Sequence, residues 1–374
     1  NALGANTTGA ENVAMGDLAL QDNTTGGKNT SVGTSSLASN TTASNNTALG
    51  YAALNSNTTG TRNTSVGGNS LDANTTASDQ AAFGYNSLTD NTTGCCLSAF
   101  GSSALANNTT ADYNTAVGYQ AMFTNTTGTS NAALGKNALV NATTANHNVA
   151  LGTDAFQSAT TGFEGVAVGS NAGGSVTTGG DNTLIGYVAG NHNIGLSTGA
   201  GNVIVGAYSD VPATDTNHAI VMGYDVTGVG ADNFTFGRGS VDSNIAFGAT
   251  SITAPSDIRL KEDIEDEQVG LEFINELRPV TFRWKKAKDV SEELTLHKAD
   301  SEERVMNGKY NHGFIAQEVK ETIDKYNLKD GFDMWQEDEE DGRQRIGDAS
   351  LMPILVKAVQ ELSAKVDELE NKLN

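Results

Sequence analysis

The chain has 374 residues, of which 42 are glycine and only 4 are proline, and 37% are hydrophobic, which is too little apolar material for one large globular core. Its formal net charge of −22 argues against nucleic acid or an anionic membrane as a partner held by bulk electrostatics. No apolar run approaches the roughly 20 residues of a membrane helix, so membrane insertion is not expected. Because the chain starts at Asn1 within a repeat, we expect it to be a fragment of a longer protein.

Glycine recurs with a fixed 17-residue period from Gly16 to Gly186. An apolar residue precedes each of these glycines, and for most of them a second one follows four residues later, as in NTALGYAALNSNTTGTR (46–62). A fixed period predicts that each unit is one turn of a solenoid or fibre, and a 17-residue unit suits two short strands and two turns. Turns stacked about 4.8 Å apart would align asparagine and threonine into hydrogen-bonded ladders. The glycine would allow a backbone conformation that a side chain forbids.

Each turn offers only about two large apolar side chains, so we expect several chains to share the core. The motifs NTSVG, NTALG, AIVMG and NFTFG resemble the head repeats of trimeric autotransporter adhesins and related phage fibres, which are trimers of parallel β-rolls. The expected fold is therefore mainly β, a trimeric parallel β-roll or β-prism, with a monomeric solenoid as the alternative. Regular repeats span residues 1–198, and a distal shaft with shorter periods spans residues 199–251.

Two other features of this region invite a chemical interpretation. Each NTT triplet has the pattern of an N-glycosylation site, but it recurs because the fold repeats, so ladder asparagines are the better interpretation. Cys95 and Cys96 are adjacent, which rarely allows a disulfide between them, and we interpret them as buried small residues, with an interchain bridge as the alternative. Without CxxC pairs or a Cys/His cluster, no metal and no cofactor is expected.

The composition changes near residue 252. Residues 1–250 hold 15 acidic and 4 basic side chains, whereas the remaining 124 hold 29 acidic and 18 basic ones. Residues 252–374 are expected to form a small α+β domain. Its patterns predict an amphipathic helix stopped by Pro279, a following strand, a second strand that leads into a helix in HGFIAQEVKETIDKY, and an acidic loop over residues 330–341.

The last segment, residues 350–374, is predicted to be a coiled-coil helix. Two rows of apolar residues recur every seven positions and alternate by three and four, which is the a/d seam of a coiled coil about three heptads long. Valine at a and leucine at d favour two strands if anything, so the expectation of a trimer rests on resemblance and not on this helix.

Four motifs follow one another in this part of the chain, namely SDIRLK (256–261), LRPVTFRWK (277–285), HGFIAQEV (312–319) and SLMPILVKAVQEL (350–362). Through these motifs, residues 252–374 resemble the C-terminal intramolecular chaperone, auto-processing domain of phage tail spikes and tail fibres, including endosialidases. The resemblance implies trimerisation, chaperoning of the preceding β-fibre, and then self-cleavage just before the serine of the first motif.

On that motif Ser256 corresponds to the catalytic nucleophile and Lys261 to its base, and the cleaved bond joins Pro255 to Ser256. A serine hydroxyl needs a base to remove its proton, and a lysine can act as one only if desolvation lowers its pKa. Burial at a trimer interface would do this. Without the resemblance, Ser256 would be interpreted as a helix N-cap or turn residue and Lys261 as a solvated lysine.

The expected function is that of a viral tail fibre in the virion, assembled in the host cytoplasm as a homotrimer. Its partner would be a host cell-surface receptor, a glycan or an outer-membrane component, and its only activity a single-turnover cleavage of its own chain. The alternatives are a bacterial surface adhesin with the same domain and a tail spike that degrades polysaccharide. A glycosidase needs two carboxylates across one bond, whereas the acidic residues of the shaft are sparse, scattered and unaccompanied by aromatic sugar platforms.

Overall fold

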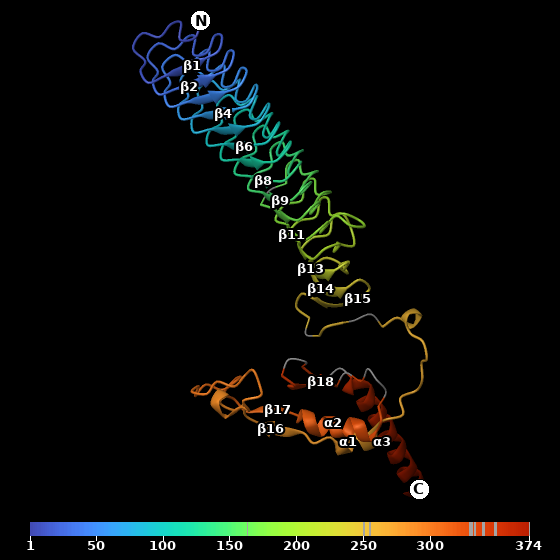
Figure 1. The fold of residues 1–374 in the computed structure, drawn as a ribbon. Coiled ribbons are helices and arrows are strands. Elements are labelled where there is room, and N and C mark those ends of the chain that lie inside the picture. The colour runs from blue at the N-terminus through green and yellow to red at the C-terminus, as the bar shows by residue number, and fades with distance from the viewer. Residues whose placement is uncertain are drawn as a thin grey trace. The chain divides into compact units, whose positions relative to one another are not determined.

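The computed structural model describes residues 1–162, 164–249, 251–253, 256–328, 332, 334–338, 341–347 and 350–373. The chain forms two compact units, Asn1–Ser256 and Asp257–Asn374 (Figure 1). Pro255, the expected residue before the cleaved bond, lies outside the described residues.

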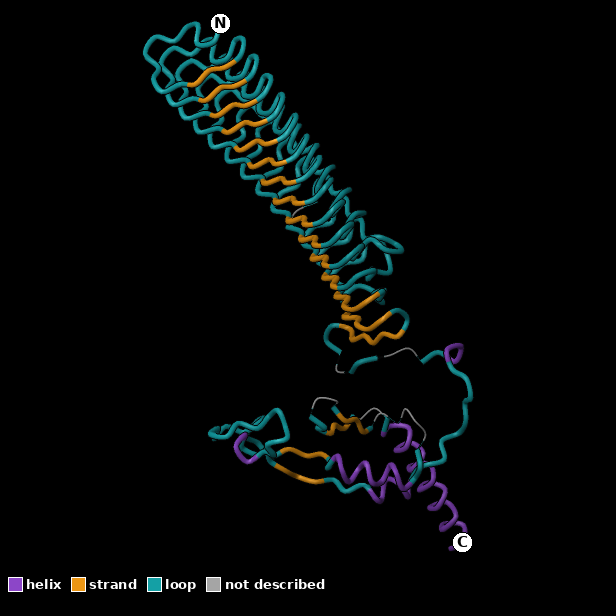
Figure 2. Tube along the Cα trace, in the orientation of Figure 1, coloured by secondary structure: helices purple, strands orange, loops and turns teal. Residues whose placement is uncertain are grey.

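The first unit is a β-solenoid whose successive turns each add one strand to a single sheet of 15 strands (Figure 2). Strands β1 to β14 are parallel, and β15 pairs antiparallel with β14. The strands are β1 Val13–Met15, β2 Thr30–Val32, β3 Thr47–Leu49, β4 Thr64–Val66, β5 Ala81–Phe83, β6 Ser98–Phe100, β7 Thr115–Val117, β8 Ala132–Leu134, β9 Val149–Leu151, β10 Val166–Val168, β11 Thr183–Ile185, β12 Val203–Val205, β13 Ile220–Tyr224, β14 Asn233–Arg238 and β15 Val241–Ala246.

The register of the sheet follows the sequence period. From β1 to β11 each residue pairs with its counterpart in the next 17-residue unit, as Thr47 does with Thr64. The mainly β, repeat-based fold is thus confirmed. The expectation of two strands per turn is wrong, because each turn has one strand and otherwise consists of tight bends. The repeated leucine lies in such a bend with positive φ, 49° at Leu37, which no sequence pattern announces.

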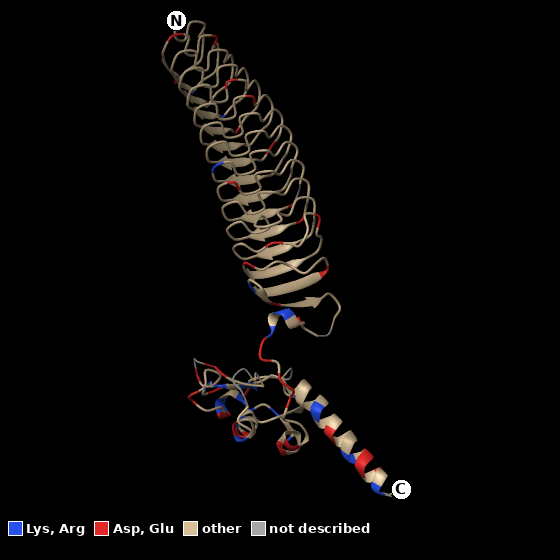
Figure 3. Ribbon diagram, turned by 90° about the vertical axis from the view of Figure 1, so that its right-hand side faces the viewer, with Lys and Arg blue, Asp and Glu red and all other residues tan. Residues whose placement is uncertain are grey.

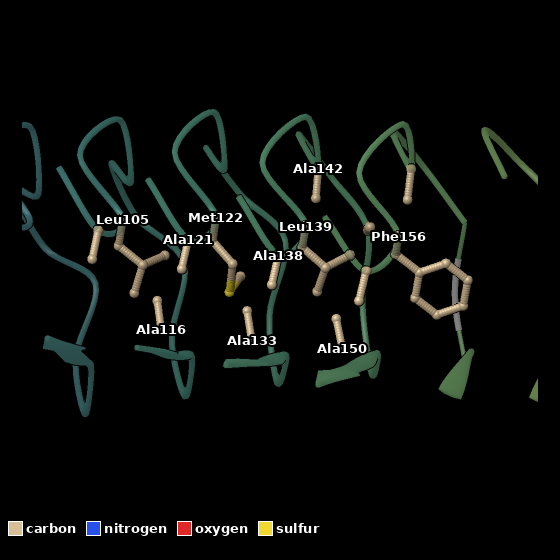
Figure 4. Close-up of a cluster of buried hydrophobic side chains, with 14 of the residues drawn as sticks. Leu105, Ala116, Ala121, Met122, Ala133, Ala138, Leu139, Ala142, Ala150 and Phe156 are labelled. Atoms are coloured by element: carbon tan, nitrogen blue, oxygen red, sulfur yellow. The ribbon is translucent and has the colours of Figure 1, made fainter. Parts of the chain in front are cut away.

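The core of the solenoid is enclosed by a single chain. The middle residue of each strand and the repeated leucine both point inward, so Ala48 and Leu54 are fully buried. Figure 4 shows the same arrangement in later turns, where Met122 points toward Ala133 and Leu139 toward Ala150. Alanine and small polar residues fill the narrow cross-section, so the one large apolar side chain that a regular turn buries, such as Leu54, suffices. The expectation that several chains must share this core is corrected, and strands pair within one chain as in a β-roll.

Asparagine ladders run through the buried interior, as expected from the NTT triplets. Asn57 is fully buried, and its Nδ2 donates to Oδ1 of Asn40 and to the Gly60 carbonyl, both at 3.0 Å. Its own Oδ1 accepts from Nδ2 of Asn74 at 2.9 Å. A buried amide with these partners is a structural element of the core, which confirms the ladder interpretation of these triplets.

The glycine before each bend is required by close backbone stacking. Gly84 has φ of 139°, and a Cβ at this position would lie 2.4 Å from the carbonyl oxygen of Gly101 in the next turn. Such a contact is far shorter than any real one, so the 17-residue glycine period records a packing requirement.

Charge separates the two units, since side chains of Lys, Arg, Asp and Glu are sparse on the solenoid and frequent in the C-terminal unit (Figure 3). The cysteines of the solenoid differ from expectation, because Cys96 is exposed and Cys95 only partly buried. Their sulfur atoms are 3.1 Å apart, and the hydrogen bond from Cys96 is the main cause that raises the pKa of Cys95 to about 12.

The second unit is a small α+β domain, and its elements are η1 Ile258–Leu260, α1 Leu271–Glu276, β16 Val280–Phe282, η2 Ala287–Asp289, β17 Asn311–Gly313, α2 Ala316–Lys325, β18 Trp335–Glu337, β19 Gln344–Ile346 and α3 Leu351–Leu373. The predicted helices and the first two strands are confirmed. The expected acidic loop instead contains β18, which pairs with β19. A core of Phe273, Leu277, Val319, Met334 and Ile354 joins α1, α2 and α3.

Candidate functional site

The segment that carries the predicted catalytic pair contains one short helical turn. Asp257 is the N-cap of η1, and its Oδ1 accepts from the backbone N–H of Arg259 at 2.9 Å. The Arg259 side chain folds back on the same carboxylate, which lowers the pKa of Asp257 and raises that of Arg259. Lys261 is the C-cap, and its N–H donates to the Ile258 carbonyl at 3.2 Å. The turn therefore sets the backbone path between Ser256 and Lys261.

The two predicted catalytic residues fall on either side of the boundary between the units. Ser256 is the last residue of the first unit, and Lys261 lies in the second. Both residues are exposed to solvent in the single chain. Between them, Arg259 forms a salt bridge with Asp257 at 2.5 Å.

Apolar side chains beside the pair are also exposed. Ile258 is 73% exposed and Leu260 68%, and Ile264 is exposed as well. Three large aliphatic side chains within seven residues thus remain mostly exposed in the single chain, although each would be stabilised by about 1.5–3 kcal/mol if it were fully buried. Such a surface is typical of a contact with another chain.

Two of the four motifs pair with each other in the second unit. Strand β16 from LRPVTFRWK pairs with β17 from HGFIAQEV, so that Thr281 lies opposite His312. An ion pair also links the same two motifs, since Nε of Arg278 donates to Oε2 of Glu318 at 2.9 Å. The arginine lowers the pKa of Glu318, which is thus held as a structural carboxylate.

Helix α3 leaves the predicted coiled-coil seam uncovered. Val359, in the middle of the seam, is 64% exposed. The seam residues on the outer side of the helix are all exposed, namely Met352, Leu355, Val359, Leu362, Val366, Leu369 and Leu373. The helix meets its own domain through Ile354 and Ala358 instead, which are buried. One face of α3 thus packs within the chain, and the heptad face has no cover from the described residues of the chain.

A comparable stripe runs along the solenoid. The last residue of each regular strand, directly before the repeated glycine, points away from the core, and its side chain is apolar in every turn. Phe83 and Phe100 stack there in parallel, with ring centroids 4.8 Å apart. The most exposed members are Met15, Leu49, Leu134 and Met222. We call this row the outer apolar stripe.

The fold thus defines a class, a β-solenoid shaft followed by a small α+β domain that ends in a helix with an uncovered heptad face. Residues 256–328 match the peptidase family described as "chaperone of endosialidase". Three of the four motifs lie within this range, and the fourth, at residues 350–362, lies beyond it. Neither the curated proteins nor the solved structures include a match to this chain.

Among the described residues, no helix combines the length and the apolar character that a membrane span requires. No group of three or more His, Cys, Asp or Glu side chains among them is arranged to hold a metal ion.

Sequence reasoning missed one aromatic site. Tyr187, Tyr208 and Tyr224 come from three successive turns, and Tyr208 contacts both of the others, although the three are well separated in the sequence. The signal was present, since Tyr187 and Tyr224 both directly follow a repeated glycine, but Tyr208 lies one position later and breaks the pattern. The sequence analysis, which noted no aromatic sugar platforms on the shaft, thus did not anticipate this aromatic cluster.

Proposed function

We propose that this chain is part of a homotrimeric viral tail fibre whose C-terminal unit templates the trimer and then cleaves the chain between Pro255 and Ser256. The observation that carries the proposal is the family match, which begins at Ser256, the predicted nucleophile. In this account the cut separates the shaft from its chaperone.

Assembly into a trimer would cover the apolar surfaces that the single chain leaves open. The heptad face of α3 needs partner helices, because a coiled-coil seam gains its stability from the interdigitation of facing a and d side chains. The outer apolar stripe would be covered by a flat apolar surface, and the same stripe on another copy of the chain is such a surface. The number three comes from the families that the motifs resemble.

The chaperone role follows from the way such a shaft must fold. Its 14 parallel strands pair only with the next turn, so an incomplete solenoid exposes unpaired edges. Long parallel stacks form slowly for this reason, and their weak step is nucleation in register. A globular trimer at the C-terminal end would hold three chains together in the same register and so start the shaft correctly.

The cleavage chemistry assigns one step to each residue of the pair. Oγ of Ser256 forms a bond to the carbonyl carbon of Pro255, and the peptide bond to the nitrogen of Ser256 breaks. Nζ of Lys261 accepts the hydroxyl proton and returns it to the departing nitrogen. Water then hydrolyses the resulting ester, which leaves a carboxylate on Pro255 and a free amino group on Ser256.

Assembly would also activate the base. An ammonium group cannot accept a proton, so Lys261 must lose solvent for its pKa to fall. In the single chain Lys261 is exposed, and so are Ile258, Leu260 and Ile264 around it. If these side chains become buried between copies, the lysine loses water at the same moment. Cleavage would therefore wait for the trimer.

The experiment is a time course of the expressed chain on denaturing gels, with boiled and unboiled samples side by side. Wild type should give a trimer band and a C-terminal piece whose N-terminal sequence begins at Ser256. Ser256→Ala and Lys261→Ala should each remain full length and still form trimers, whereas Lys285→Ala, an exposed lysine of the same unit, should be cleaved normally. Cleavage of the Ser256→Ala chain at the wild-type rate would contradict the proposal. Pro255→Ala tests whether the proline slows the cut.

A further inference from the structure

The longest turn between neighbouring strands of the parallel sheet connects β11 with β12. Thr183 pairs with Val203, and Asn202 donates to Asn182, so the offset here is 20 in place of the usual 17. The three additional residues lie between Gly190 and Leu196. In repeat proteins an insertion in one unit commonly forms a loop on the binding face.

A buried carboxylate holds this inserted loop. Asp210, in the following turn, is fully buried, and its Oδ2 accepts hydrogen bonds from the consecutive backbone N–H groups of Asn193, Ile194 and Gly195 at 2.9, 3.0 and 3.0 Å. Three charge-assisted bonds to one oxygen fix the loop backbone. A loop that is already ordered gives up little entropy when it binds a ligand.

The ordered loop places His192 on an aromatic cluster. The imidazole lies edge to face with Tyr208, with ring centroids 4.9 Å apart. Tyr208 in turn contacts Tyr187 at 5.3 Å and Tyr224 at 5.6 Å, again edge to face. Asp225 completes the group, with its Oδ1 3.7 Å from Nε2 of His192. We call these five residues the tyrosine platform.

Most of the platform remains open to solvent. Tyr187 is 51% exposed and Tyr224 is 53% exposed, so each presents a large part of its ring. The side chain of Asp225 is also about half exposed. Rigid phenol rings with a carboxylate beside them present apolar ring faces and hydrogen-bonding groups next to one another on the same surface.

We infer that the tyrosine platform binds a pyranose unit of a cell-surface glycan. The C–H face of a pyranose packs on an aromatic ring, and its hydroxyls donate to carboxylates and exchange hydrogen bonds with phenol groups, which matches Tyr187, Tyr224 and Asp225. A quaternary ammonium ion would instead need rings arranged around it as a cage. Here the rings lie edge to face along successive turns, at interplanar angles of 79° and 76°. The inference deepens the proposed function, since it assigns host attachment to these turns of the shaft.

The test uses the full-length protein in its trimeric form. The probe is an immobilised panel of hexose and N-acetylhexosamine oligosaccharides, with a choline-coated surface as a separate arm. Wild type should bind at least one oligosaccharide, and the double variant Tyr187→Ser/Tyr224→Ser should bind it at least tenfold more weakly. The matched control is Tyr85→Ser/Tyr119→Ser, because these exposed tyrosines also directly follow repeated glycines. It should bind within twofold of wild type, and circular dichroism checks that both variants fold.

Three results would overturn the inference: no binding to any oligosaccharide by wild type, equal loss in both double variants, or binding to the choline surface alone. The proposed function is judged separately, from cleavage and oligomeric state of the same samples. A cleaved trimer that binds no sugar overturns only the tyrosine platform. A chain that binds sugar through the tyrosine platform but never trimerises overturns only the proposed function.

Discussion

The asparagine ladder allows a quantitative prediction, because it has both an interior and an end. In the interior, Asn57→Ala removes three hydrogen bonds and leaves Oδ1 of Asn40 buried without its donor. At the end, Oδ1 of Asn125 has no hydrogen-bond partner among the described residues, because the next turn presents Ala142 in place of asparagine. Asn125→Ala removes two donated bonds and leaves Oδ1 of Asn108 without its donor, but it also removes one atom that was already unsatisfied.

Asn57→Ala should therefore lower the free energy of unfolding more than Asn125→Ala does, by about the contribution of one hydrogen bond and one buried acceptor without a partner. A buried polar group that loses its partner costs about 1–3 kcal/mol. With the cavity included, we expect about 3 kcal/mol for Asn57→Ala and about 1.5 kcal/mol for Asn125→Ala. At about 1.4 kcal/mol per factor of ten, the difference corresponds to roughly tenfold in rate.

The assay is the unfolding rate of the shaft in guanidinium chloride, followed by far-ultraviolet circular dichroism. A rate is the suitable quantity, because a shaft separated from its chaperone is expected to persist kinetically. Asn57→Ala should unfold roughly a hundredfold faster than wild type and Asn125→Ala roughly tenfold faster, taking about 1.4 kcal/mol per factor of ten. Thr59→Ala, at an exposed position of the same triplet, is the control and should stay within about twofold. Equal rates for the two asparagine variants would refute the reasoning.

Three other predictions follow from single contacts. Gly84→Ala should block folding of the shaft into soluble protein, because its Cβ would meet a carbonyl at 2.4 Å, whereas Gly230→Ala, with nothing within 4 Å, should express normally. Val359→Asp should shift the unboiled gel band from trimer to monomer, since it puts a charge on the heptad face, and Ser363→Asp, an exposed position outside the seam, should not. The ion pair with Arg278 lowers the pKa of Glu318 below its ordinary value of 4.5. The ion pair therefore contributes fully to the stability of the fold above pH 4.5, and this contribution is lost as the pH falls through the lowered pKa. Acid unfolding of Glu318→Gln should therefore depend less steeply on pH, and an unchanged acid transition would contradict the ion pair.

The repeat made much of the shaft predictable. A 17-residue glycine period without gaps allows only stacked turns, so the mainly β fold, the ladders and the role of the glycine all follow from the sequence. The conformation of each bend does not follow, because leucine with positive φ, as at Leu37, contradicts local propensity and is imposed by the turn above and below. The closed single-chain core was missed because buried asparagine and alanine were counted as non-core material.

The candidate functional residues can be compared in the same way. Ser256 and Lys261 were predicted from a motif, and their local backbone follows from the Asp257 cap. The tyrosine platform is only partly signalled by the sequence, because Tyr187 and Tyr224 share a repeat position whereas Tyr208 lies one position later, in a turn where the offset is 20 and not 17. A pattern tied to a strict period cannot report what happens where the period changes.

Native mass spectrometry of the protein as expressed tests the central claim most directly, because one spectrum reports both oligomeric state and cleavage. The account predicts a trimer of the shaft and a C-terminal piece of 119 residues (374 − 255) that begins at Ser256. A spectrum dominated by an uncut monomer of 374 residues would contradict it.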